Sequence, residues 1–332
     1  TLIQAAGRGV GVYLQVDGYA SQKLPKQFVA ELRKAGVQFK WFEQLFKSRN
    51  FYFGRRLHHK VVVVDGIYSL VGGINISNRY NDMPGADAWM DMALYCEGEA
   101  SLEVHALCRS MWGKTGPDRL DPARAEEYFR QVDEKDLHEV RIRRNDWVKR
   151  KNQVTKSYFY MLLHAEKEIT IMCSYFIPGR VFRREIGNAL KRGVKLRVIL
   201  AGPSDVMVAK HAERYLYDWL LKNNIEIYEY QKTVLHAKVA VYDNHWATIG
   251  SYNVNNISAY ASLELNMDVR NPSFAEQTTF GLERIIQQDC KKITREDYAS
   301  SSHFFRRLWQ RMCYSFISNM LSLFTFYFKQ EE

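Results

Sequence analysis

The sequence predicts a duplicated α/β protein in which each half is a mixed β-sheet flanked by helices. The main observation is the stretch Leu57 to Asn75, which recurs 178 residues later as Leu235 to Asn253. Both copies read H-x-K-x4-D-x6-G-[GS]-x-N, and five matched positions at one constant offset indicate an internal repeat. Each copy contains a β-branched run, Val61 to Val64 or Val239 to Val241, that favours a buried strand. Helical and strand patterns alternate in the same order around both copies, which is typical of an α/β fold.

The order of the elements supports the duplication. A helix at Pro25 to Ala35 and a strand at Val37 to Phe42 precede the first motif. A helix at His211 to Lys222 and a strand at Ile225 to Tyr230 repeat this order before the second motif. The second half also has an earlier strand, Glu168 to Tyr175, for which the first half shows no counterpart. We therefore expect the first half to lack its leading strand and to begin within a helix.

The motif spacing places polar side chains on one face of each strand. Successive side chains of a strand alternate between its two faces, so His58 and Lys60 point the same way. Asp65 lies an odd step beyond Lys60 and should leave that face, whereas the following turn should return Asn75 towards the histidine. The second copy repeats the arrangement, and its candidate site residues are His236, Lys238, Asp243 and Asn253.

An imidazole, an ammonium and an amide together suit phosphoryl chemistry. An imidazole can attack phosphorus or move protons near neutral pH, and Lys and Asn can hold phosphate oxygens as their charge grows. Two such sets at one site would supply a nucleophile and a general acid without a metal. We therefore expect neither a cofactor nor a metal ion.

The doubled His-Lys-Asp motif resembles that of the phospholipase D superfamily, and YEYQ at Tyr228 to Gln231, followed by LHAK, is similar to its bacterial cardiolipin synthases. The resemblance implies two phospholipase D-like domains related by a pseudo-twofold axis, with one active site at their interface. It implies His58 as nucleophile and His236 as acid on the leaving group, a choice that the residues alone leave open. The implied reaction joins two phosphatidylglycerol molecules into cardiolipin and glycerol through a phosphohistidine. A hydrolytic phospholipase D and a nuclease of this superfamily are the alternatives.

A carboxylate should orient each histidine. The family pattern places an acidic residue, commonly Glu, after the motif, and a catalytic imidazole needs its far nitrogen held by an acceptor. Asp91 and Asp268 lie 16 and 15 residues past the asparagines of their motifs. We expect Asp91 to hold His58 and Asp268 to hold His236. Glu264 is the second choice in the second half.

The composition is that of a globular protein with an anionic partner. The 332 residues are 46% hydrophobic and 25% charged, and the net charge is +10. Such a charge suits nucleic acid or an anionic membrane, although it also fits a solvated basic surface. The five cysteines are odd in number and scattered, without the spacing of zinc ligands.

Two basic segments are candidates for phosphate contacts. The loop Lys47 to Arg56 is basic and aromatic and leads into the first motif, so we expect it to border the substrate cleft. The segment Gly113 to Asn152 should connect the halves, with a helical part around Ala123 to Val132. Its RIRR and KRK runs fit either phosphate binding or a solvated linker.

We expect three parts: residues 1–140 as the first phospholipase D-like domain with its linker, 141–290 as the second, and 291–332 as a membrane-associating tail. The tail is apolar from Cys313 to Phe328, which is short for a membrane span. It fits an interfacial helix, with three arginines facing anionic head groups, or a helix docked on the second domain. The arginines are Arg306, Arg307 and Arg311. This tail favours a phospholipid over nucleic acid, and a peripheral protein on the cytosolic face of the cytoplasmic membrane.

Overall fold

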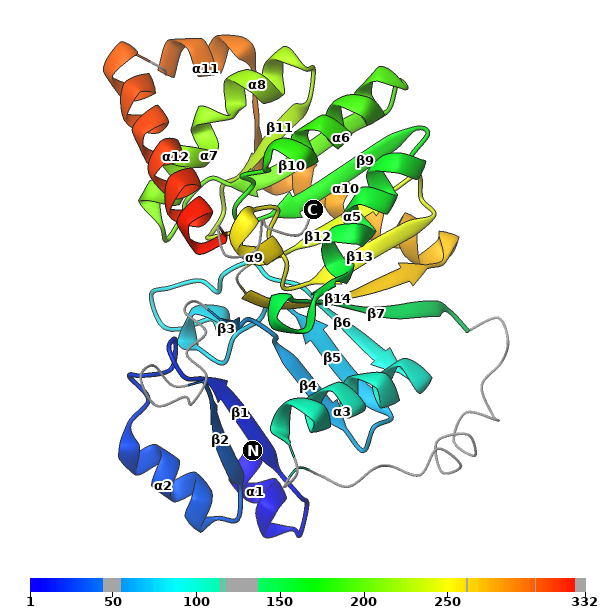
Figure 1. Cartoon of the computed structure of the whole chain (residues 1–332), viewed down its shortest axis with the longest axis vertical. Helices are drawn as coiled ribbons and strands as arrows, with labels where there is room; N and C mark the ends of the chain where they lie inside the picture. Colours follow the sequence, from blue (N-terminus) through cyan, green and yellow to red (C-terminus); the bar gives the residue numbers. More distant parts are fainter. Residues whose placement is uncertain (44–54, 114–115, 117–136, 261, 302, 326–332) are drawn as a thin grey trace.

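The architecture is a large mixed sheet with two smaller sheets of the first half packed below it in the view of Figure 1, which shows a computed structural model. The structure describes residues 1–43, 55–113, 116, 137–260, 262–301 and 303–325. The two halves meet where β3 and β14 pair in parallel, so the fold is continuous across the repeat boundary.

The large sheet has the strand order β15-β11-β10-β9-β12-β13-β14-β7-β8, and β3 pairs with β14 outside this path. β9, β10 and β11 are parallel, whereas β12, β13, β14 and β7 pair antiparallel with their neighbours. The bounds are β3 Arg56–Leu57, β7 Glu139–Asp146, β8 Lys151–Asn152, β9 Glu168–Cys173, β10 Lys195–Ala201, β11 Glu226–Tyr230, β12 Val239–Tyr242, β13 Trp246–Gly250, β14 Ser262–Arg270 and β15 Cys290–Ile293.

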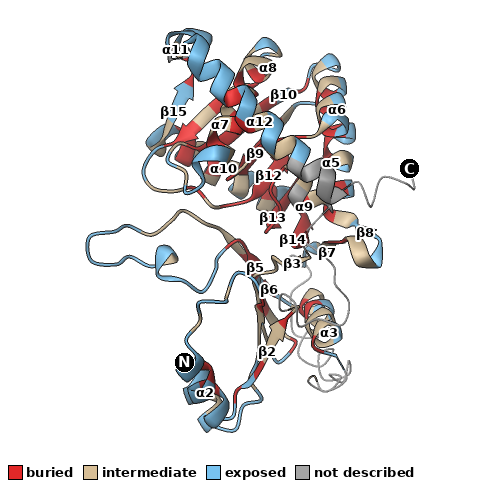
Figure 2. Ribbon diagram, turned by 60° about the vertical axis from the view of Figure 1, so that its left-hand side comes forward, coloured by how far each residue is buried: buried red, intermediate tan, exposed pale blue. Residues whose placement is uncertain are grey.

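Alternating side chains of the large sheet fill two cores, one on each face. Ile171 of β9 packs in a core that α5 and α6 close, whereas its neighbour Met172 joins the core on the opposite face. That second core is closed by α10 and by residues of the first half, including Val71 and Val104. The strands at the centre of the sheet are accordingly buried (Figure 2). The helices of this half are α5 Gln153–His164, α6 Arg180–Lys191, α7 Met207–Tyr215, α8 Tyr217–Lys222, α9 Asn256–Tyr260, α10 Pro272–Asp289, α11 Arg295–Ser301 and α12 Phe304–Thr325.

The first half has a parallel pair of strands, β1 with β2, and an antiparallel sheet, β4-β5-β6. In the second half β9 joins β10 to β12, but among the described residues no strand joins β1 to β4. The elements are α1 Leu2–Gly7, β1 Tyr13–Asp17, α2 Lys26–Lys34, β2 Gln38–Phe42, β4 Val61–Val64, β5 Tyr68–Gly72, β6 Ala93–Glu97 and α3 Glu99–Trp112, with short 3-10 turns at Asn78–Tyr80 and Trp147–Lys149.

Most expected elements are present at nearly their expected bounds. One expected helix is two helices, α7 and α8, which meet at Leu216. The expectation of a polar connection up to Asn152 is wrong at its end, because RIRR lies in β7. Val140 and Ile142 pack in the second core, and Arg141 and Arg143 point to the other face, which is a strand pattern. The helix expected around Ala123 to Val132, and all but the last two residues of the loop Lys47 to Arg56, lie outside the described residues.

Candidate active site

His58 follows a short strand that reaches across to the second half. Because β3 pairs with the start of β14, the His58 N–H donates to the Leu263 carbonyl oxygen at 3.1 Å. This contact brings the imidazole to Glu264, whose Oε2 lies 2.8 Å from His58 Nδ1. The hydroxyls of Ser251 and Ser262 donate to the same buried carboxylate at 2.5 and 2.6 Å. The carboxylate that holds His58 is therefore fixed from three sides.

His236 is placed by the equivalent contact in the opposite direction. Met90 of the first half forms a parallel bridge with Leu235, and its carbonyl oxygen accepts from the His236 N–H at 2.7 Å. His236 Nδ1 lies 2.7 Å from Asp91 Oδ2, and the Met92 N–H donates to the other oxygen of that carboxylate at 2.8 Å. Asp91 is thus held by the backbone directly before β6 while it holds a histidine of the other half.

Each histidine is therefore oriented by a carboxylate from the opposite half. A carboxylate accepts the Nδ1 proton, so the neutral imidazole keeps a free lone pair on Nε2 for attack or proton transfer. The arrangement is complete only when the two halves are docked. The His58 side chain is 31% exposed and that of His236 is 12% exposed, so His58 is the more accessible of the two.

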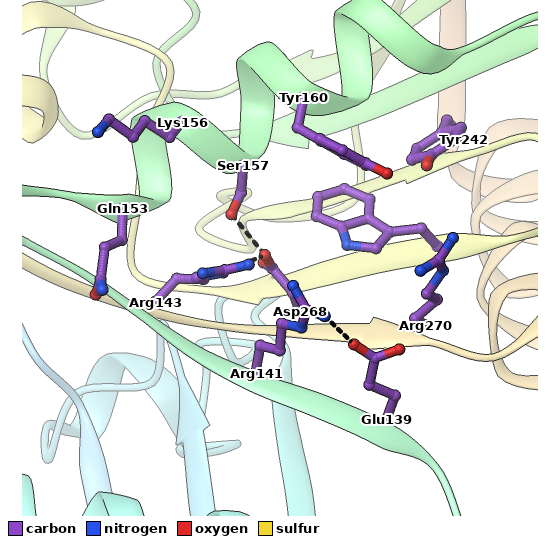
Figure 3. A pocket seen from close by; sticks show the side chains of 11 residues that line it. Glu139, Arg141, Arg143, Gln153, Lys156, Ser157, Tyr160, Tyr242, Asp268 and Arg270 are labelled. Atoms are coloured by element: carbon purple, nitrogen blue, oxygen red, sulfur yellow. Dashed lines mark hydrogen bonds and ion pairs between the residues drawn. The ribbon is translucent and has the colours of Figure 1, made fainter.

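The expected pairing of the acids is wrong in both halves. Asp91 holds His236 rather than His58, and Glu264, the second choice, holds His58. Asp268 contacts neither: its Oδ2 accepts from Arg143 at 3.0 Å and from Ser157 at 2.5 Å. It lines a separate cavity between α5 and one face of the large sheet (Figure 3).

The strand register shows why the spacing misled. Gly72 pairs with Ala93 in the first half, and Gly250 pairs with Asn266 in the second. The acids that hold the histidines both stand two residues before these partners, so they are true equivalents. They lie 16 and 11 residues past the motif asparagines, because the loop after the first motif is longer. A prediction from equal spacing therefore selects Asp268, which lies four residues further along the strand than Glu264.

The motif lysines turn back onto the histidines. Lys60 Nζ donates to the His58 carbonyl oxygen at 2.9 Å. Lys238 Nζ donates to the His236 carbonyl oxygen and to Ser174 Oγ, the latter at 3.1 Å. Burial lowers the pKa of Lys60 to about 7 and that of Lys238 to about 8, although the nearby carboxylates oppose this effect. Both ammonium groups therefore sit where an anionic ligand would restore their charge.

Burial also lowers the pKa of both histidines, and each half acts on the other. For His58 the Glu264 carboxylate opposes the lowering of the pKa, and the Lys60 and Lys238 charges add to it. Burial and then the Lys238 charge lower the pKa of His236 to about 4. Since charges of one half shift pKa values in the other, the two motif copies form one electrostatic site.

The motif aspartates and glycines have structural positions, away from the histidines. Asp65 and Asp243 stand in the tight turns after their strands with φ of 52° and 50°. The Asp243 carboxylate accepts three backbone N–H bonds from residues 166–168 at 2.7 to 3.0 Å. The prediction that Asp243 points away from the phosphate face is confirmed. A Cβ at Gly72 would lie 2.4 Å from the Met92 carbonyl oxygen, and a Cβ at Gly250 would lie 2.3 Å from the Leu265 carbonyl oxygen, so only glycine fits.

The two asparagines lie differently. Asn75 is exposed and its Nδ2 donates to the Tyr80 hydroxyl at 2.7 Å. The Tyr80 ring packs edge-on against His236, with centroids 5.5 Å apart, and Trp89 lies beside the same imidazole. Asn253 is buried, and its Oδ1 has no hydrogen-bond partner among the described residues. Sequence reasoning missed Tyr80, whose one signal was its place in the loop after the first motif.

Two histidine–lysine sets that face each other on a duplicated α/β scaffold define a site of the phospholipase D class. A family model described as "Cardiolipin synthase, PLD-like domain" matches residues 1–108 and 158–286. The chain therefore belongs to this family, and the resemblance expected from the sequence is confirmed.

Relatives and solved structures agree with this assignment. The chain is 32% identical over 307 residues to cardiolipin synthase B of Shigella flexneri, which covers 88% of this chain and 71% of the relative. It is 30% identical over 268 residues to cardiolipin synthase of Halalkalibacterium halodurans, covering 80% and 53%. The crystal structure of phosphatidylserine synthase from Haemophilus influenzae matches with a TM-score of 0.63 and 12% identity over 97% of this chain and 90% of that one. This last match shows the shared fold.

Proposed function

We propose that the chain is a phosphatidyltransferase that joins two phosphatidylglycerol molecules into cardiolipin and glycerol. The observation that carries the proposal is the reciprocal pair of histidine–carboxylate contacts, which prepares two imidazoles for complementary roles at one site. The names of the relatives at 30–33% identity support phosphatidyl transfer rather than another phosphodiester reaction. Nε2 of the more accessible His58 acts as nucleophile.

In the first step, His58 Nε2 attacks phosphorus and the bond to the glycerol head group breaks. His236 donates its Nε2 proton to the leaving glycerol oxygen. The pKa of about 4 applies to His236 without substrate, and a bound anionic phosphodiester raises it by stabilising the imidazolium. Lys60 and Lys238 stabilise the non-bridging oxygens, whose charge grows in the transition state.

In the second step, the neutral His236 takes a proton from the hydroxyl of a second phosphatidylglycerol. The resulting oxygen attacks the phosphorus of the phosphatidyl-His58, and the P–N bond breaks to give cardiolipin. Asp91 and Glu264 keep both rings in one tautomer throughout, so that the same two Nε2 atoms serve both steps.

A carboxylate near Lys238 supports a polyhydroxyl acceptor. Asp205, just after β10, accepts the Tyr175 hydroxyl at 2.5 Å. Tyr175 directly follows Ser174, which contacts Lys238. A carboxylate repels a phosphodiester but accepts hydrogen bonds from hydroxyls, so its place at the rim suits a glycerol head group.

The C-terminal helix supports binding to a lipid surface. No described helix is both long and apolar enough to cross a membrane. The inner face of α12 docks on α7, where Cys313 is buried and the rings of Tyr314 and Tyr215 lie 4.9 Å apart. Its outer face exposes apolar side chains next to the three arginines expected to meet head groups. The exposed apolar residues are Phe304, Phe305, Leu308, Trp309, Met312 and Phe316. The inner face of α12 therefore fits the docked alternative for the tail. We propose that the outer face, which exposes the apolar side chains, meets the lipid surface.

Vesicle binding tests the outer face of α12. Replacement of Phe305, Trp309 and Phe316 by Ser should weaken binding to phosphatidylglycerol vesicles at least about 100-fold, because each large apolar side chain contributes roughly 1.5–3 kcal/mol when buried. Phe280→Ser is the matched control, since Phe280 is 71% exposed on α10. Unchanged vesicle binding of the triple variant would show that the outer face of α12 does not contact the membrane.

Lipid analysis after incubation with phosphatidylglycerol tests the reaction. We expect cardiolipin and glycerol as main products, with phosphatidic acid as a minor one. Dominant phosphatidic acid would make the protein a hydrolase with the same residues. Cleavage of DNA at comparable rates without action on lipid would instead assign it to the nucleases.

A further inference from the structure

A cavity separate from the active site lies between α5 and the face of the large sheet at β14 and β7 (Figure 3). Its volume is about 240 Å³, which suits a small ligand, because drug-sized ligands occupy about 300–1,000 Å³. None of the histidines or lysines of the active site lines it. Asp268, at its floor, is four residues from Glu264 along β14, which is about 13 Å at about 3.3 Å per strand residue.

The cavity carries a surplus of positive charge. Four cationic side chains and two carboxylates line it, and each carboxylate already has its own arginine. Arg143 Nε lies 3.0 Å from Asp268, and Arg141 pairs with Glu139 at 2.5 Å. Lys156 and Arg270, the other two cations, have no carboxylate within ion-pair distance among the described residues. The Arg270 guanidinium donates to the imidazole of His245 at 3.3 Å.

Hydroxyl donors face the same space. Tyr160 of α5 and Tyr242 of β12 turn their hydroxyl ends towards each other and towards Arg270 (Figure 3). Burial raises the pKa of Tyr242 to about 12, with a smaller effect of Tyr160, so both the hydroxyl and its donor capacity persist at neutral pH. Donors therefore converge from a helix on one side and from strands on the other.

We propose that this cavity binds the phosphate group of a small organophosphate, either free in solution or as the head group of a lipid. Lysine, arginine and tyrosine donors reach the space from different directions. Tetrahedral phosphate oxygens accept from several directions at once, whereas a carboxylate accepts in one plane. A phosphate of one or two negative charges matches the surplus of two cations. The site is distinct from the catalytic centre and does not depend on the proposed reaction.

Protection of Lys156 from an amine-acylating reagent tests the site directly. Peptide mapping by mass spectrometry follows Lys156 of the full chain, with Lys151 as control, because both are exposed but only Lys156 lines the cavity. The probes are sn-glycerol 3-phosphate, succinate and phosphatidylglycerol vesicles. At about ten times Kd, roughly nine-tenths of the sites are occupied, so acylation of Lys156 should slow about tenfold while Lys151 is unaffected.

The probes and one variant decide the outcome. Protection by glycerol 3-phosphate alone identifies a soluble ligand, and protection by vesicles alone, without protection of Lys151, identifies a lipid head group. Arg270→Gln should abolish protection and keep full turnover on phosphatidylglycerol, since Arg270 is outside the active site. Equal rates at Lys156 with and without every phosphate probe, or equal protection by succinate, would overturn the proposal. The readout is acylation, so its failure is distinguishable from failure of the proposed reaction.

Discussion

The two halves share one motif but bury it differently. In the second half Ala240 and Thr248 are completely buried, because α5 and α6 cover that face of the sheet. Their counterparts in the first half, Val62 and Leu70, are 56% and 38% exposed. The catalytic parts, by contrast, are nearly symmetric: each histidine has one carboxylate, and each lysine contacts the carbonyl oxygen of its own histidine.

This difference shows that contacts across the interface between the halves orient the catalytic histidines. The number of strands and covering helices in each half does not decide their geometry. The first half presents Asp91 and Met90 to His236, and the second half presents Glu264 and Leu263 to His58. Neither half can orient its own histidine. Substitution of either crossed carboxylate should therefore lower kcat to a similar extent. Matching substitutions in the scaffolds of the two halves should lower the free energy of unfolding to different extents.

Removal of either histidine should have the largest effect. His58→Ala and His236→Ala should each lower kcat by about 10⁴-fold or more, because a nucleophile and its acid–base partner act as a unit. The double variant should be little worse than either one. The rate of cardiolipin formation measures this, and substantial turnover in one single variant would break the model of one shared site.

The crossed carboxylates should come next. Asp91→Asn and Glu264→Gln should each lower kcat by roughly 10²–10⁴-fold, because the amide no longer fixes the productive tautomer. Asp268→Asn should change kcat less than about tenfold, since Asp268 contacts no histidine. Steady-state kinetics, with folding checked by circular dichroism, shows which carboxylates hold the histidines. A severe loss for Asp268→Asn with mild losses for the other two would restore the original pairing.

The lysines should set the alkaline limb of activity. A base with a lowered pKa is charged below that pKa and loses its charge as pH rises through it. With pKa values of about 7 for Lys60 and about 8 for Lys238, kcat/KM should fall as pH rises from about 7 to 9. Lys60→Arg stays charged and should move this limb to higher pH, even at a reduced maximum. If Lys60→Arg leaves the alkaline fall of kcat/KM unchanged, another titrating group causes that fall.

The scaffold should show the smallest effect and the clearest asymmetry. Val239→Ala should lower the free energy of unfolding by about 1–3 kcal/mol, because Val239 is fully buried and its removal leaves a cavity. Val62→Ala, which removes the same atoms from a 56% exposed side chain, should cost less than about 0.5 kcal/mol. Urea unfolding of both variants measures this. Equal losses would mean that the exposed face of the first half is covered in solution.

The sequence predicted the duplicated fold and the two histidine–lysine pairs, because a constant offset needs no knowledge of packing. It did not predict which acid meets which histidine. Asp91 and Glu264 cross between the halves, and a loop of different length hides their equivalence. The charged residues of β7 indicate a linker, and they mask the alternation of apolar and charged side chains that is typical of a strand. Tyr80 was not predicted, because no hydrophobic periodicity marks a loop residue that packs on an imidazole far away in the sequence.

The division of roles between the two histidines is tested most directly with the p-nitrophenyl ester of phosphatidic acid, whose leaving group needs no proton. His236→Ala should release one equivalent of nitrophenolate per protein and then stop, because no base remains to activate the acceptor. Peptide mapping should find the phosphatidyl group on His58. An adduct on another residue, or no burst while the wild-type protein turns over, would contradict the account.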